Sequence, residues 1–382
     1  MKGFCGIDIE KDKVFISFAS FNKGILNFLE EVKLDLEEKQ YDLLNFFKNY
    51  ISFINQKIIE RKSIYSLDIF DIFINIDLDF VNERIVEEVV PFNKLKKISI
   101  SDINFAKKYL ENSSLEWDDL CIHNFIINYN VNNQNYYNPP IGILTKKIKL
   151  KSLLIYIKNS LYEETDSIFD AFNLKFLNFV YKPISAFSIA LNQKKDFKDK
   201  IIFYIGYDRS YLIIYLDKKI KSIKKFDFGL KNIFFEIEKK FLVPTALSKE
   251  IFNRYISFRE DLPFKEITIK NNDSYMNLNI NTLNLFTKNY IKDEISKIID
   301  EDLINLGKKD IEIVFLGRLN LYDGFSEFIK NFISFPIEIV KNYGLSCSFG
   351  AIKYGLERPL ENNLIGKPSI FKKIVEVYKE YF

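Results

Sequence analysis

The sequence predicts an α/β fold built from two duplicated halves, with a smaller α+β insert in the first half. The order strand, turn, strand, turn, strand and helix begins at Phe4 and occurs again from Ile201. Such long-period self-similarity is typical of duplicated halves. Between the two copies lies a segment with its own helix and strands. At roughly 100–200 residues per domain, the 382 residues allow two to four domains.

The first half opens with three expected strands, at Phe4–Ile9, Lys13–Ser20 and Ile25–Leu34, separated by polar turns. In the second strand every other residue is a β-branched or aromatic apolar residue, which is typical of a half-buried strand. An amphipathic helix follows over residues 43–58, with apolar residues at spacings of three and four. Asp71–Phe80 alternates again and is expected to close this sheet.

The insert is expected to contain one helix and at least two strands. The helix over Ser101–Leu110 begins at a favourable N-cap, and Leu120–Tyr129 and Lys147–Ile157 have the composition of strands. A helix over Tyr162–Phe172 then leads back to the core.

The second half repeats the plan of the first. Its strands are expected at Ile201–Ile205, Ser210–Leu216 and Ile220–Phe228, with Gly206-Tyr207-Asp208-Arg209 as the first turn and a helix starting at Leu230. The remaining expected elements are helices at Leu247–Phe258, Tyr290–Leu306, Phe325–Phe332 and Cys347–Leu356, and strands at Phe264–Ile269, Ile311–Leu316 and Phe335–Val340.

These elements divide the chain into eight segments. They are subdomain 1A with the first hairpin (1–84), the insert (85–160), a connecting helix and return to the core (161–200), subdomain 2A with the second hairpin (201–243), subdomain 2B (244–308), a return to subdomain 2A (309–357), a linker (358–368) and an amphipathic helix (369–382).

The composition argues against several classes of protein. Cys5, Cys121 and Cys347 are too few and too widely spaced for a disulfide framework or a zinc site. His123 is the only histidine, which argues against Ser-His-Asp and Cys-His hydrolases. The net charge of +3 is too balanced to indicate nucleic-acid binding. With no secretory signal and no apolar run of 18 residues, we expect a cytoplasmic chain.

Two hairpin-led α/β subdomains with an insert are the plan of the actin/Hsp70 superfamily. Its two RNase H-like subdomains hold the phosphates of a nucleotide with their hairpin turns. The sequence therefore resembles the actin/Hsp70 superfamily, and this resemblance implies an actin/Hsp70-like fold with an SHS2-like α+β insert in the first half.

Four motifs carry a more specific resemblance. They are Gly6-Ile-Asp-Ile-Glu-Lys-Asp-Lys-Val14, the run Ile122–Val131 with Asn138-Pro-Pro-Ile-Gly142 after it, the stretch from Gly317 to Gly324, and Gly350–Leu356. In order, they are similar to the first phosphate loop, the insert-domain run, the adenosine loop and the closing helix of the bacterial cell-division protein FtsA family. The resemblance spans nearly the whole chain.

The resemblance implies a scaffold for cell division, peripheral on the inner face of the cell membrane at the division site. Such a protein self-associates into filaments and tethers FtsZ, the tubulin-like division-ring protein, to the membrane. The FtsZ tail would dock on residues 244–306 here.

The resemblance also implies a site for ATP and Mg²⁺. Carried over by motif position, Asp8 would hold a Mg²⁺-bound water, Lys13 and Ser210 would contact phosphate, and Glu250 would contact the ribose. Gly206 and Gly317 would bring the backbone close to the nucleotide. The resemblance assigns no catalytic residue and no direct metal ligand.

The phosphate loops depart from the family pattern. Glu10-Lys11-Asp12 stands where the family has Gly-Thr-Ser, which places a carboxylate where a phosphate should bind. The second loop, usually D-I-G-G-G-T-T-D, is here Tyr204 to Tyr211 and keeps only one glycine, Gly206. We therefore expect an eroded site with weak ATP and Mg²⁺ binding and little or no hydrolysis.

The terminal helix keeps the family chemistry better. Its expected membrane-binding residues are Ile370, Phe371, Lys372, Lys373, Ile374, Val375, Tyr378 and Phe382. They combine an apolar stripe with lysines suited to anionic headgroups. The alternative is an ordinary amphipathic helix docked on the core.

Two other functions stay open. Val81–Phe92 mildly resembles PilM, an actin-like protein of type IV pilus assembly at the inner membrane. An actin-fold kinase would need intact glycine loops and a catalytic Asp, which Tyr204 and Tyr211 argue against. The aromatic loop Asn130–Asn138 lacks basic residues, so no nucleic-acid partner is expected.

Overall fold

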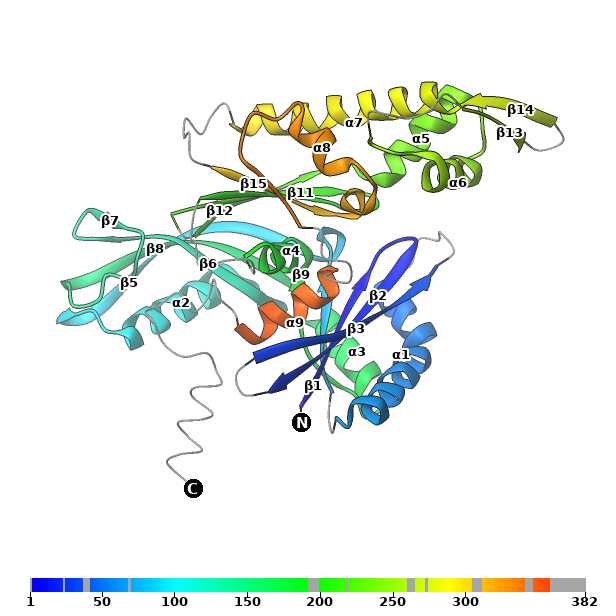
Figure 1. The fold of residues 1–382 in the computed structure, drawn as a ribbon. Helices are drawn as coiled ribbons and strands as arrows, with labels where there is room; N and C mark the ends of the chain where they lie inside the picture. The colour runs from blue at the N-terminus through cyan, green and yellow to red at the C-terminus, as the bar shows by residue number, and fades with distance from the viewer. Residues whose placement is uncertain are drawn as a thin grey trace. The chain divides into compact units, whose positions relative to one another are not determined.

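A computed structural model describes residues 2–22, 25–36, 42–67, 70–191, 199–217, 219–259, 265–271, 274–303, 311–340 and 346–357 (Figure 1). The chain divides into two compact units. The described residues of the first come from 1–194, 219–221 and 344–382, and those of the second from 195–218 and 222–343. Among the described residues, no helix is both long and apolar enough to span a membrane.

The first unit is organised around a five-stranded sheet. Its strand order is β3 (Ile25–Asp35), β2 (Lys13–Asn22), β1 (Gly3–Ile9), β4 (Phe70–Ile76) and β9 (Lys175–Tyr181). The first three strands form an antiparallel meander, whereas β4 runs parallel to β1 and β9 runs parallel to β4. The expected strand Asp71–Phe80 ends at Ile76, and a short 3₁₀ turn, η1 (Leu78–Phe80), follows it.

Two pairs of helices cover the two faces of this sheet. On one face α1 (Leu43–Tyr65) packs against α3 (Asn159–Asp170), with the rings of Phe47 and Phe169 in contact. On the other face α4 (Lys182–Ala190) packs against α9 (Cys347–Glu357). Helix α9 lies close to β1 because Gly6 has no side chain: a Cβ there would lie 1.9 Å from the carbonyl oxygen of Ser348.

The insert forms a four-stranded sheet with one helix. The strand order is β5 (Asn82–Lys97), β8 (Leu144–Lys158), β6 (Asp119–Val131) and β7 (Gln134–Tyr136). Helix α2 (Ile100–Ser114) begins with a capping box between Ser99 and Asp102 and buries Ile103, Ala106 and Leu110 against the sheet.

The second unit repeats the sheet of the first. Its strand order is β12 (Lys219–Phe226), β11 (Ser210–Leu216), β10 (Lys200–Ile205), β15 (Glu312–Gly317) and β16 (Ile337–Ile339). As in the first unit, the leading strand β10 pairs antiparallel with the next strand along the chain and parallel with the strand on its other side. This equivalence confirms the predicted duplicated α/β fold.

Helices and a hairpin complete the second unit. They are α5 (Leu230–Phe241), α6 (Thr245–Tyr255), the hairpin β13 (Glu266–Asn271) and β14 (Ser274–Asn279), α7 (Ile280–Leu303), the short turn η3 (Arg318–Leu321) and α8 (Phe325–Lys330). Their apolar residues form one core with the sheet, in which Phe252, Leu283 and Ile295 are fully buried.

The structure differs from the predicted organisation in two respects. The segment 309–357 was expected to return wholly to the second half, but α9 belongs to the first unit. The sequence pattern also missed β9 and α4, which follow α3 directly, and the second strand of the β13–β14 hairpin. The expected linker 358–368 and amphipathic helix 369–382 lie outside the described residues.

Candidate functional site

The first hairpin, formed by β1, β2 and the turn between them, carries three buried carboxylates. The backbone N–H of Glu10 donates to the carbonyl of Lys13 over 2.8 Å, which closes the turn. Asp8 is 2% exposed, Glu10 is 8% exposed and Asp12 is 2% exposed. Carboxylates buried to this extent require a compensating charge or hydrogen bonds.

Lys182 supplies that compensating charge. It follows β9 directly as the first residue of α4, and it is only 4% exposed. Its Nζ lies 3.1 Å from Oδ1 of Asp8 and 2.8 Å from Oε1 of Glu10. Asp8, Glu10 and Lys182 therefore form a buried ionic cluster, called here the Lys182 cluster.

The protonation preferences in the Lys182 cluster follow from burial and proximity. The pKa of Asp8 is raised to about 6. Burial is the largest cause, Lys182 opposes it, and the neighbouring Glu10 carboxylate adds to it. Burial lowers the pKa of Lys182, but the carboxylates of Asp8 and Glu10 outweigh this effect and raise it. Lys182 is therefore charged throughout the physiological range. Ionising both Asp8 and Glu10 beside it costs free energy, because the two carboxylates repel each other.

The residues of the first hairpin do not fit a phosphate. The Glu10 carboxylate is negative, and its Oε1 is already bonded to an internal ammonium group. Lys13, which was expected to contact phosphate, instead pairs with Asp35 of β3 at 3.0 Å. Asp8, which was expected to hold a Mg²⁺-bound water, faces Lys182. Lys182 thus stands where a cation would be needed to balance these carboxylates.

The second hairpin turn is filled by an aromatic side chain. The N–H of Gly206 donates to the carbonyl of Arg209 over 2.9 Å, and Tyr207 between them is 3% exposed. The Tyr207 ring contacts the ring of Phe234, with 6.2 Å between centroids. Lys249 and Arg318 lie over the same ring, at 5.4 Å and 5.3 Å from its centroid. In an open phosphate loop, two such cationic side chains could contact an anion. Here they lie against the face of an aromatic ring instead.

Ser210 also has an internal partner. Its side chain is fully buried, and its Oγ donates to the carbonyl of Phe228 over 2.6 Å. Tyr204 and Tyr211 face each other across β10 and β11, with 6.4 Å between ring centroids. The tyrosines that replace the acidic residues of the family pattern thus form a stacked pair at the base of the hairpin.

Gly317 and Glu250, the other predicted residues of the second unit, each have a structural explanation. Gly317 ends β15 at a φ of +112°, and a Cβ there would lie 2.1 Å from the carbonyl oxygen of Ile205, next to Gly206. A glycine is therefore required by the pairing of β15 with β10, whether or not a nucleotide binds. Glu250 is half-exposed on α6 and pairs with Arg254 at 2.9 Å.

The sequence pattern missed Lys182. The signal was present in Phe176–Pro183, where a lone lysine follows an apolar run and directly precedes a proline. His123, expected to be a strand residue of the insert, lies in β6, and its Nε2 accepts a hydrogen bond from the N–H of Tyr181 over 3.0 Å. This bond fixes the end of β9, from which Lys182 enters the cluster.

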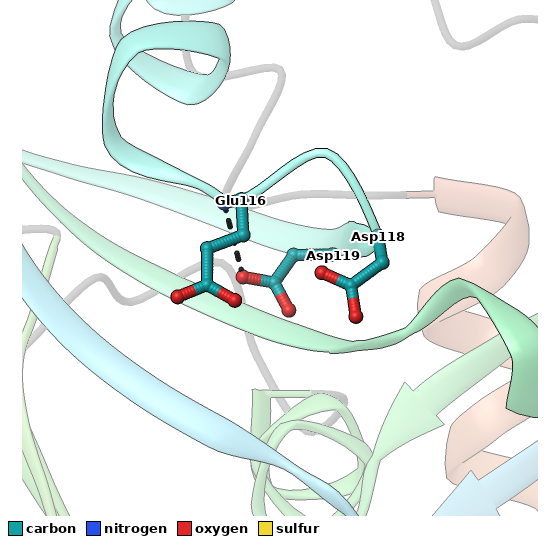
Figure 2. Close-up of side chains that lie close together, drawn as sticks. All are labelled: Glu116, Asp118 and Asp119. Atoms are coloured by element: carbon teal, nitrogen blue, oxygen red, sulfur yellow. Dashed lines mark hydrogen bonds between the residues drawn. The ribbon is translucent and has the colours of Figure 1, made fainter.

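A second gathering of carboxylates lies in the insert, where α2 connects to β6. Glu116, Asp118 and Asp119 point toward one another (Figure 2). The Nζ of Lys158 lies 3.4 Å, 3.1 Å and 2.9 Å from their oxygens, respectively. The ammonium group of Lys158 thus already pairs with all three carboxylates. The acidic turn is therefore not proposed as a metal site.

Comparison with known proteins identifies the fold but not a family. No protein-family profile and no curated protein matches the sequence. Among solved structures, the PilM–PilN type IV pilus biogenesis complex matches with a TM-score of 0.58 at 11% identity, over 88% of this chain and 87% of that chain. The ethanolamine utilization protein EutJ from Carboxydothermus hydrogenoformans matches with a TM-score of 0.53 at 12% identity, over 92% and 90% of the chains.

MreB5 of Spiroplasma citri, in a structure bound to ADP, matches with a TM-score of 0.53 at 8% identity, over 96% of this chain and 99% of that chain. These similarities show that the chain has the fold of the actin-like ATPases.

Proposed function

We propose that this protein is an actin-like assembly scaffold that does not depend on ATP hydrolysis. The observation that carries the proposal is the Lys182 cluster, in which an internal ammonium group pairs with Asp8 and Glu10 of the first hairpin. A phosphate loop works by presenting backbone N–H groups to an anion through glycine turns. Here the turn presents Glu10 instead, so binding a phosphate would place two anions side by side.

The second hairpin supports the same proposal independently. Tyr207 is buried, and Ser210 donates its hydroxyl proton to the Phe228 carbonyl. Opening this turn to a phosphate would require exposing the tyrosine ring and breaking a buried hydrogen bond. In both turns, residues that stand at phosphate-binding positions of the family pattern have partners within the chain.

The purified full chain is expected to turn over ATP far below the usual enzyme range of roughly 1–10³ per second. The physical reason is that neither turn presents an open anion site. Steady-state phosphate release in the presence of Mg²⁺ checks this result, with an active actin-fold ATPase purified in parallel as the positive control. Turnover within the usual range, or Mg²⁺-dependent nucleotide binding tighter than about micromolar, would contradict the proposal.

Within this class we propose a role in cell division, as the FtsA resemblance implies. The chain would self-associate and bind the tail of FtsZ on residues 244–306, the range that contains α6, the β13–β14 hairpin and α7. The test is binding of a synthetic FtsZ tail peptide to the full chain. A peptide with the same composition in scrambled order is the control, and equal binding of the two would argue against this role.

The proposed membrane contact is the segment 369–382. The full chain should sediment with vesicles that contain anionic lipid, and a chain that stops after Pro368 should stay in the supernatant. Each large apolar side chain that is fully buried contributes roughly 1.5–3 kcal/mol. Ordering the helix costs roughly 1–2 kcal/mol per residue. The balance is small, so one copy should bind weakly and an assembly firmly.

The control for vesicle binding is a matched pair of double variants. Phe371→Glu with Ile374→Glu changes the apolar stripe and should abolish sedimentation, whereas Glu376→Gln with Glu380→Gln changes the polar side and should preserve it. If the full chain never sediments with anionic vesicles, this part of the proposal fails.

A pilus-assembly role is the second candidate, and the similarity to the PilM–PilN complex favours it. The segment that resembles PilM, Val81–Phe92, lies in β5 except for its first residue, and β5 is an edge strand of the insert sheet. Co-purification with a pilus inner-membrane partner encoded nearby, without binding to the FtsZ tail, would favour this role over division.

A further inference from the structure

The insert carries an exposed aromatic surface. Phe105 and Tyr109 lie on an exposed side of α2, beside the residues that α2 buries, and are 57% and 42% exposed. Their rings are neighbours, with 6.2 Å between centroids. Trp117, three residues beyond the end of α2, is 97% exposed. We call Phe105, Tyr109 and Trp117 the aromatic strip.

An acidic turn borders the aromatic strip. Trp117 lies between Glu116 and Asp118, in the turn whose three carboxylates are drawn in Figure 2. Those three carboxylates share the ammonium group of Lys158. An excess of negative charge therefore surrounds the exposed indole ring. A bilayer rich in anionic lipid would be repelled there, whereas a segment combining an apolar stripe with lysines would be attracted.

One segment of this chain has that chemistry and can reach the strip. The described part of the chain ends with α9, and the ring of Tyr354 in α9 lies 5.2 Å from the ring of His123 in β6. Trp117 precedes His123 by six residues, about 20 Å at most along an extended chain. The eleven residues 358–368 can span up to about 36–40 Å when extended.

We propose that residues 369–382 dock on the aromatic strip of the same chain. Ile370, Phe371 and Ile374 would cover Phe105, Tyr109 and Trp117, and Lys372 and Lys373 would lie near the acidic turn. A helix of this length spans about 21 Å, comparable with the strip, because Phe105 to Ser114 alone covers about 14 Å. The docked state goes beyond the proposed membrane contact and competes with it, since both use the same apolar stripe.

The chain provides its own reporter, because Trp117 is its only tryptophan. The experiment compares the full chain with a chain that stops after Pro368, by tryptophan emission and acrylamide quenching in the absence of lipid. The full chain should emit at shorter wavelength. If the docked state is populated more than half of the time, its quenching constant should be lower by about two-fold or more.

Two double variants of the full chain sharpen the comparison. Phe105→Ser with Tyr109→Ser should restore the emission and quenching of the shortened chain without lowering the melting temperature, because both side chains are exposed. Glu376→Gln with Glu380→Gln should leave the protection unchanged. Identical emission and quenching in the full and shortened chains would overturn the proposal. Protection that disappears on dilution would also overturn it, because the covering segment would then belong to a second copy.

Vesicles separate this inference from the proposed tether. Phe105→Ser with Tyr109→Ser should increase sedimentation with vesicles of mixed phosphatidylglycerol and phosphatidylcholine, because the segment is no longer sequestered. If no variant sediments but Trp117 is protected in the full chain, the tether fails and the docking stands. If the full chain sediments but Trp117 is equally exposed with and without residues 369–382, the docking fails and the tether stands.

Discussion

Replacing Lys182 by Met should lower the free energy of unfolding of the first unit by about 3–5 kcal/mol, because two buried carboxylates would lose their counter-charge. The side chains of Asp8, Glu10 and Lys182 are all nearly inaccessible to solvent, so water cannot replace the ammonium group. Calorimetry of the full chain, followed for the transition of the first unit, measures the effect.

Two controls test the origin of this loss. Lys13→Met removes a lysine from the same hairpin, but its partner Asp35 is exposed, so the cost should be at most about 1 kcal/mol. The triple variant Asp8→Asn, Glu10→Gln and Lys182→Met removes the charges together and should recover most of the stability. If Lys182→Met lowered the free energy of unfolding no more than Lys13→Met, the Lys182 cluster would not stabilise the first unit.

The cluster should also respond to pH in a defined direction. The pKa of Asp8 is raised from its ordinary value of 3.8 to about 6, so the folded state binds this proton more tightly than the unfolded state. The contribution of Asp8 to stability is therefore greatest below pH 3.8 and is lost as the pH rises through about 6. Asp8→Asn should accordingly preserve or raise the melting temperature at neutral pH, in contrast to Lys182→Met.

The second large effect is expected at Gly6. Gly6→Ala would place a Cβ 1.9 Å from the carbonyl oxygen of Ser348, so α9 must move away from β1. Overpacking typically costs roughly 1–3 kcal/mol and occasionally more, and the upper end is expected because the clash is with backbone. Amide hydrogen exchange should accelerate in α9 while that of α1, on the opposite face of the sheet, stays slow.

Gly142→Ala is the matched control for Gly6→Ala. Gly142 has a φ of +84°, but a Cβ there would meet nothing within 4 Å. Its cost should therefore be limited to backbone strain of roughly 1–2 kcal/mol, with no change in α9. Equal destabilisation by the two variants, or unchanged exchange in α9, would show that close packing at Gly6 does not hold the helix.

The duplicated fold could be predicted because its signals are local. Period-two strands, polar turns and helix spacing of three and four all lie within short windows of sequence. The location of α9 could not be predicted in this way, because it depends on contacts between Ser348 and Gly6 at opposite ends of the chain. The short α4 was missed because it is buried all round and so has no polar face to mark its period.

The candidate site, too, could be predicted only in part. Glu10 and Tyr207 could be identified as departures, because each stands at a fixed offset within a motif. What they do in the fold could not be predicted. Glu10 is bound by a lysine 172 residues away, and Tyr207 is covered by cations from two other elements. Such partners are set by tertiary structure and have no signature in the sequence around the motif.

The internal lysine of the first hairpin has a consequence for how assemblies of this protein would be controlled. A protein that binds nucleotide only when folded gains stability with ligand concentration, and hydrolysis can then mark the age of each subunit in a polymer. Lys182 is part of the chain and, unlike a bound nucleotide, is not hydrolysed or exchanged. Subunits with this internal cation therefore stay chemically identical however long they have been assembled. Disassembly would then be driven by dilution or by a partner protein, and its rate would be insensitive to the cellular ratio of ATP to ADP.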